Sequence, residues 1–102
     1  MSDLEERYLE LVRSELPTAA REQGWVIRND HCFGRVLLDD AVGGCWYDVL
    51  GRGRGSAFRR LDPDQLAHAV EQGERMLREG GETVRALDAQ SLAWRGKAPK
   101  RP

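Results

Sequence analysis

Two neighbouring residues, His31 and Cys32, have the side-chain types of a nucleophile and its base. Asn29 and Asp30 precede them and are good N-cap residues, so Cys32 is expected in the first turn of a helix. There the unpaired backbone N–H groups and the helix dipole favour a thiolate, which a histidine can activate further. Consecutive helical residues point about 100° apart, so a buried cysteine beside a half-exposed histidine is the competing interpretation.

Carboxylates follow on the same stretch of chain. His31, Arg35 and Asp39 are spaced at i, i+4 and i+8, so a helix places them on one stripe. Asp39 and Asp40 are consecutive and must diverge on a helix, which favours a solvated face with salt bridges to nearby arginines over paired acid–base work. The candidate catalytic residues are His31, Cys32 and Asp39.

A zinc site can be assembled from His31, Cys32, Cys45 and His68. The ligand types suit zinc, but no C-x-x-C or H-x-x-x-H spacing is present, so we expect no metal. Two cysteines are too few for a disulfide scaffold, and we expect both to be reduced.

Four arginines, Arg52, Arg54, Arg59 and Arg60, lie between Gly51 and Leu61, and no acidic residue lies among them. The first two alternate with glycines. Glycine exposes backbone N–H groups and arginine binds phosphate through two donors, so this loop could hold an anionic ligand. An ordinary surface loop is the alternative. Neighbouring aromatic residues anchor interfaces, although they also fill thin cores. The candidate ligand-binding residues are Arg35, Arg52, Arg54, Trp46 and Tyr47.

The chain has 102 residues and a formal net charge of −1. That length suits one domain, predicted over residues 1–96, with a basic, disordered tail at 97–102. So short a chain has a thin core, and pairing into a homodimer would stabilise it. No apolar run is long enough to cross a membrane and the N-terminus does not resemble a signal peptide, so a cytoplasmic location is expected.

The elements that position these residues are predicted to be helices. The strongest signal runs from Pro63 to Glu79, where Asp62 and Gln65 form a capping box and Leu66, Val70, Gly73 and Leu77 form a buried stripe. Other helices are expected from Ser2 until Pro17 stops or kinks the chain, from Asn29 to Gly43, and from Glu82 to Ala93. The fold class is therefore mainly α, with four to five short helices. The alternative is α+β, with a short hairpin around residues 35–50.

Six residues, Arg52-Gly53-Arg54-Gly55-Ser56-Ala57, are similar to the R-x-x-G-x-A phosphate loop of the GNAT acetyltransferases. The resemblance implies a strand at Cys45–Leu50 and backbone contacts to coenzyme A from Arg52, Gly53, Gly55 and Ala57. Separately, Asn29-Asp-His-Cys-Phe33, Leu38-Asp39 and Ser91-Leu-Ala-Trp-Arg-Gly-Lys97 resemble a group of small uncharacterised bacterial proteins. That resemblance implies a bacterial cytosolic origin and no known activity.

The sequence does not determine what the protein does. The leading hypothesis is a non-enzymatic binding module for a protein or an anionic ligand, without a cofactor. Nucleic acid is less favoured because the net charge is close to zero. The alternative is a small enzyme, either an acyl or acetyl transferase using coenzyme A or a cysteine-dependent activity at His31 and Cys32. Whether the protein is an enzyme therefore stays open at this point.

Overall fold

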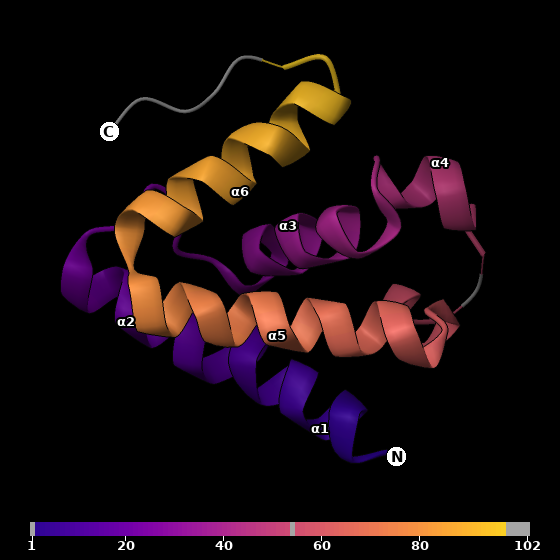
Figure 1. The fold of residues 1–102 in the computed structure, drawn as a ribbon, viewed down its shortest axis with the longest axis horizontal. Helices are drawn as coiled ribbons and strands as arrows, with labels where there is room; N and C mark the ends of the chain where they lie inside the picture. Colours follow the sequence, from indigo (N-terminus) through magenta and orange to yellow (C-terminus); the bar gives the residue numbers. More distant parts are fainter. Residues whose placement is uncertain (1, 54, 98–102) are drawn as a thin grey trace.

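The first helical segment is one continuous rod, seen in the computed structural model, which describes residues 2–53 and 55–97 (Figure 1). It joins α1 (Asp3–Glu10), a π-helical turn (Leu11–Glu15) and α2 (Leu16–Gln23). In an α-helix the ring of Pro17 would meet the carbonyl four residues earlier, and a wider turn relieves that contact. The Leu16 N–H accordingly bonds the Leu11 carbonyl, five residues back. Pro17 was predicted to stop or kink the helix, but the chain stays helical: the π-helical turn comes just before Pro17, which lies in the first turn of α2.

The middle of the chain forms two helices. α3 spans Asp30–Val42 and α4 spans Trp46–Leu50, with no strand in the described residues. The mainly α prediction is confirmed, and the alternative hairpin at residues 35–50 is wrong. The physical reason is the spacing of three and four between Phe33, Val36 and Leu37, which puts all three on one fully buried helix face. A strand would have sent alternate residues to solvent.

The C-terminal half forms a helix pair, α5 (Pro63–Glu79) and α6 (Gly81–Trp94), preceded by a 3-10 turn at Ala57–Arg60. The predicted capping box is confirmed, because Asp62 Oδ1 accepts the Gln65 N–H at 2.8 Å and Gln65 Oε1 accepts the Asp62 N–H at 3.0 Å. The predicted buried stripe of α5 differs from the structure at its C-terminal end. Met76 is fully buried, whereas Leu77 is only half-buried.

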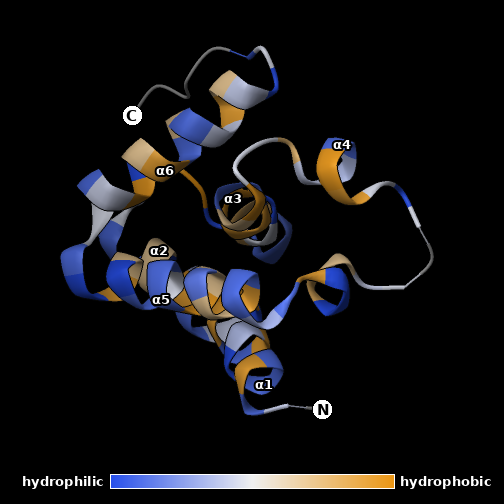
Figure 2. Ribbon diagram, turned by 45° about the vertical axis from the view of Figure 1, so that its right-hand side comes forward, coloured by the Kyte–Doolittle hydropathy of each residue, from blue (hydrophilic) through white to orange (hydrophobic). Residues whose placement is uncertain are grey.

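The helices pack around one core and form a single domain with five helical segments in the described part of the chain. α5 lies against α1 on one side and α3 on the other, and α6 covers α3 (Figure 1). In Figure 2 the hydrophobic colour is prominent on α3, which lies between α5 and α6. The largest fully buried apolar side chains are Phe33, Leu11, Leu16, Leu37, Met76, Val36 and Val84.

Two expectations concern the ends and surface of the chain. Of the predicted tail, Lys97 is exposed, and residues 98–102 lie outside the described residues. No helix in the part that the structure describes is long and apolar enough to cross a membrane.

The capping box makes a stability prediction. Replacing Asp62 with alanine removes the acceptor for the Gln65 N–H, and we expect the free energy of unfolding to fall by about 0.5–2 kcal/mol. Replacing Asp64, an exposed first-turn residue that does not cap, should change it by less than half as much. Urea denaturation followed by circular dichroism measures both. Equal losses in the two variants would contradict the capping role.

Candidate functional site

Asp39 is the centre of a buried polar network. Its side chain is 0% exposed on α3. Its carboxylate accepts the Arg95 Nε at 2.8 Å and Nη2 at 3.0 Å, so the guanidinium binds it with two parallel hydrogen bonds. It also accepts the Ser91 hydroxyl at 2.6 Å and the Trp46 backbone N–H at 2.9 Å. Four hydrogen bonds satisfy this carboxylate and connect α3 to α6 and to the start of α4.

A second buried ion pair extends the network along α3. Arg35 donates to Asp88 at 2.5 Å and to the hydroxyl of Ser91 at 2.7 Å. Ser91 therefore accepts from Arg35 and donates to Asp39, which links the two ion pairs in one chain of hydrogen bonds. Such a satisfied network makes the arrangement of α3 and α6 specific, because any other packing would leave charges buried and unpaired.

At the other end, the network reaches the aromatic residues of α4. Arg95 Nη1 donates to the Tyr47 hydroxyl at 3.1 Å, and its Cζ lies 4.8 Å from the centre of the Tyr47 ring. Hydrogen bonding to Asp39 raises the pKa of Arg95, so this guanidinium stays charged. The Arg52 Cζ lies 4.2 Å from the same ring. The sequence-predicted ligand-binding residues Tyr47 and Arg52 are therefore in contact, and Arg95 joins them.

The other arginines of the loop separate. Arg60 turns inward, where its Nη1 donates to the carbonyls of Leu50 at 3.2 Å and Gly51 at 2.8 Å, at the C-terminal end of α4. Its Cζ lies 5.9 Å from the Trp46 ring centre. Arg59 lies toward the N-terminal helix: its Cζ is 5.6 Å from the centre of the Phe58 ring, and Phe58 stacks on Tyr8 of α1 with the ring centres 5.2 Å apart. The Ser2 N–H lowers the pKa of Glu5, and the charge of Arg59 contributes in the same direction. Arg54 is outside the described residues.

The strand implied by the phosphate-loop resemblance does not form. Residues Trp46–Leu50 are the helix α4, and a 3-10 turn rather than a long helix follows the loop. The expectation of a strand at Cys45–Leu50 is therefore wrong. Gly53 has a packing role instead, because a Cβ there would lie 3.0 Å from Arg60 Nη1.

The three candidate catalytic residues do not form one cluster. The His31 side chain is 77% exposed and its nearest acidic neighbour is Asp30, with Nδ1 3.7 Å from Oδ1. Cys32 is half-buried against the core, and Asp39 is inside the polar network, two helical turns or about 12 Å along α3 from His31. Of the predicted stripe, only Arg35 and Asp39 converge, and they meet α6 rather than a cleft.

Asp39 and Asp40 diverge as expected. They were predicted to lie on a solvated helix face, but neither carboxylate is exposed to solvent to that extent. Asp40 faces α5, where its Oδ2 lies 2.6 Å from His68 Nε2 and accepts Gln72 Nε2 at 3.0 Å. His68, which lay off the buried stripe of its helix, thus has a structural partner. The prediction of a solvated face is wrong for Asp39, because α6 covers it.

Two members of the network, Asp88 and Ser91, were not predicted as site residues from the sequence. Both are buried. The signal was present, because Val84, Asp88, Ser91, Leu92 and Arg95 continue a single helical stripe at steps of three and four. Charged and hydroxyl residues inside an apolar stripe indicate a buried polar contact, and a second helix with matching charges, such as Arg35 and Asp39, is the expected partner.

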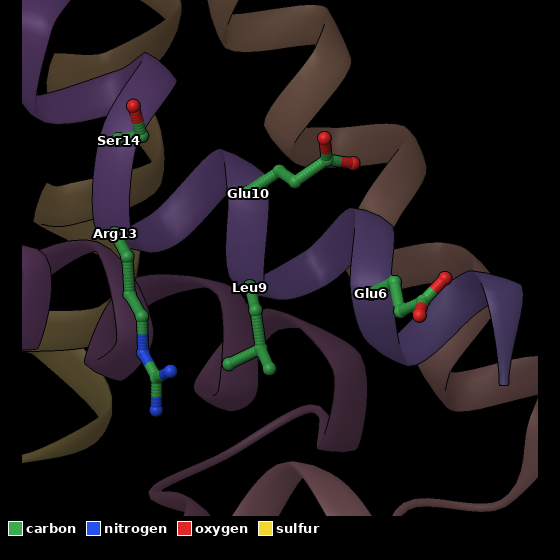
Figure 3. A pocket seen from close by; sticks show the side chains of 5 residues that line it. All are labelled: Glu6, Leu9, Glu10, Arg13 and Ser14. Atoms are coloured by element: carbon green, nitrogen blue, oxygen red, sulfur yellow. The ribbon is translucent and has the colours of Figure 1, made fainter. Parts of the chain in front are cut away.

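Outside the buried network, a site could be formed by a group of metal ligands or by a hollow in the surface of the described residues. The described residues contain no group of three or more histidine, cysteine or acidic side chains placed to hold a metal ion. A shallow hollow on the outer side of α1 and the π-helical turn is lined by the side chains shown in Figure 3, those of Glu6, Leu9, Glu10, Arg13 and Ser14. All five come from one rod, so no second element closes the hollow. Comparison of the chain with protein-family models, curated proteins and solved structures finds no match.

Proposed function

We propose that the protein is a non-enzymatic binding module whose contact surface is α4 with the adjoining arginine loop. One observation carries this proposal. α4 has the sequence Trp-Tyr-Asp-Val-Leu, yet it contains no buried residue, whereas every other α-helix of the described part buries at least one. Scattered exposed apolar residues are normal, but a helix turn whose apolar and aromatic residues are all left at least partly exposed is typical of contact surfaces.

The residues of α4 divide between two sides. Trp46 and Leu50, four residues apart, pack partly against the core. Val49 points outward and is 55% exposed, the highest value among the large apolar side chains of the described residues. The end of α6, which contacts Tyr47 through Arg95, also carries Trp94, which is 37% exposed. Figure 1 shows α4 and this end of α6 on the same side of the molecule, away from the rod. Tyr47, which Arg52 covers, lies on one flank of α4 and Val49 on the other, with the exposed Asp48 between them. We call Tyr47, Val49 and Arg52 the α4 surface.

The buried network supports a binding role over a catalytic one. It fixes α4 through Asp39, which accepts the Trp46 N–H, and through Arg95, which binds Tyr47. A surface that is rigid before binding loses less conformational entropy on contact. All four acceptor contacts of Asp39 are occupied by protein groups, so in this geometry the carboxylate supports the surface and does not face a substrate.

A site-specific photocrosslinker tests the proposal. p-Benzoylphenylalanine is placed at Val49 in one variant and, as a matched control, at the exposed Glu71 of α5 in another. Irradiation in an extract of the source cells should give a discrete adduct from position 49 only. Excess wild-type protein should suppress the adduct, whereas excess Val49→Asp should not. Equal adducts from both positions, or none from position 49, would reject the α4 surface.

A further inference from the structure

The charge of the α4 surface differs in sign from that of the whole molecule. The chain carries a net charge of −1, but the described residues from α4 to the 3-10 turn hold three arginines against the single acid Asp48. No carboxylate of the described residues lies within 4.0 Å of Arg52, Arg59 or Arg60. By contrast, Arg95 is neutralised by Asp39. Of these three arginines, Arg59 lies toward α1 and Arg60 turns inward, so Arg52 is the exposed cation beside α4 that has no carboxylate within 4.0 Å among the described residues.

Arg52 is held in place while its charge remains available. The guanidinium lies 4.2 Å from the Tyr47 ring centre, and the residue is exposed. Stacking on an aromatic face restricts the long side chain but leaves its N–H donors at the edge free for a planar carboxylate. A donor that is already oriented loses little rotamer entropy when it binds.

Arg60 adds a second cation beneath the surface. Its Nη1 is used by the carbonyls of Leu50 and Gly51, but its Nε is buried without a hydrogen-bond partner among the described residues. Gly53 lies close against this guanidinium, as the short distance to a Cβ at that position shows. Leu50, Gly51 and Gly53 therefore lie against a positive charge, and an acidic group at the α4 surface is favoured by both Arg52 and Arg60.

On the basis of the proposed function, we infer that the partner is a protein segment that presents acidic side chains beside an apolar anchor. The apolar anchor contacts Val49, and a carboxylate binds Arg52. A second copy of this chain fits less well, because its own Arg52 and Arg60 would meet like charges. Nucleic acid fits less well, because its phosphate backbone offers no apolar group to cover the exposed Val49.

Selection from a random 12-residue peptide library on the immobilised protein tests the inference. Enriched peptides should carry at least two Asp or Glu residues next to Leu, Ile, Phe or Trp. For a synthetic peptide from this set, fluorescence anisotropy should show that Arg52→Glu raises the Kd at least tenfold. Asp48→Asn should lower the Kd about two- to fivefold, because it removes a like charge. Arg85→Glu, at an exposed position of α6, should leave the Kd unchanged.

The outcomes separate this inference from the proposed function. Enriched peptides that lack acids but lose binding with Val49→Asp would overturn the acidic partner and leave the α4 surface standing. Peptides that bind independently of Val49 and Arg52, or no enrichment at all, would overturn both. Two results would identify a different partner in place of the acidic segment. One is a dimer in sedimentation analysis that depends on Arg52. The other is a 12-nucleotide single strand that binds through Arg52 more tightly than any peptide. Circular dichroism confirms that each variant is folded.

Discussion

Replacing Asp39 with alanine is expected to lower the free energy of unfolding by about 3–5 kcal/mol, a large share of the ~5–15 kcal/mol that stabilises a small domain. The substitution leaves the Arg95 guanidinium, only 11% exposed, without its carboxylate, and it removes the acceptors for Ser91 and the Trp46 N–H. Desolvating an unpaired charge costs more than the ion pair itself contributes. Urea denaturation followed by far-ultraviolet circular dichroism measures the loss.

Two further variants keep this prediction testable if Asp39→Ala does not fold. Asp39→Asn keeps the shape and an acceptor but loses the charge, and we expect a smaller loss of about 1.5–3 kcal/mol. The double variant Asp39→Ala with Arg95→Ala should lose less than the sum of the two single variants, by about 0.5–3 kcal/mol, because the residues interact directly. Asp48→Ala, on the exposed face of α4, is the matched control. Additive effects would mean that Asp39 and Arg95 do not stabilise each other, and an equal loss from Asp48→Ala would mean that burial in the network gives Asp39 no special weight.

Replacing Phe33 with alanine is the second large effect, with an expected loss of about 3–5 kcal/mol in the free energy of unfolding. Phe33 is fully buried on α3, and its ring meets Trp25 edge-to-face with the ring centres 6.2 Å apart. Removing it leaves a cavity between α3 and the connector that precedes it, and loses the aromatic contact. Chemical denaturation at several protein concentrations measures the change and separates it from any effect of association.

His31 is the natural control for Phe33, because it lies two residues away with its side chain exposed. His31→Ala should change the free energy of unfolding by no more than about 0.5 kcal/mol. This contrast would assign the Asp30-His31-Cys32-Phe33 run chiefly to the packing of α3. A loss from His31→Ala similar to that from Phe33→Ala would contradict this assignment and give the histidine a role that its exposed position does not show.

Local signals were enough to predict most of the helices. Pro63 and the Asp62–Gln65 capping box place the start of α5, and its bounds agree with the prediction, because caps and glycine stops act within one turn of chain. The ambiguity at residues 35–50 could not be removed locally. Short apolar runs suit a helix or a strand, and the burial of Phe33, Val36 and Leu37 on one face is what decides the matter.

The candidate site was predicted in part. Sequence spacing placed Arg35 and Asp39 on one helical stripe, and they do share a network. His31 and Cys32 were predicted to belong to the same site because of their residue types alone, and neither contacts the network. The partners of Arg35 and Asp39 are Asp88, Ser91 and Arg95. Each of the hydrogen bonds between the two groups joins residues more than fifty positions apart in the sequence. No spacing rule reaches across that distance.

The sequence by itself determined that the candidate catalytic and ligand-binding residues between Asn29 and Arg60 would lie on short helices and a glycine-rich loop. Only the tertiary structure decided which of them would meet. Packing of α6 on α3 buried Asp39 and used its charge internally, while the same contacts held Tyr47 and Arg52 at the surface. Helix formation depends on neighbours within a turn or two. The environment of a charged group depends on which helix covers it, and that is settled by packing over the whole core.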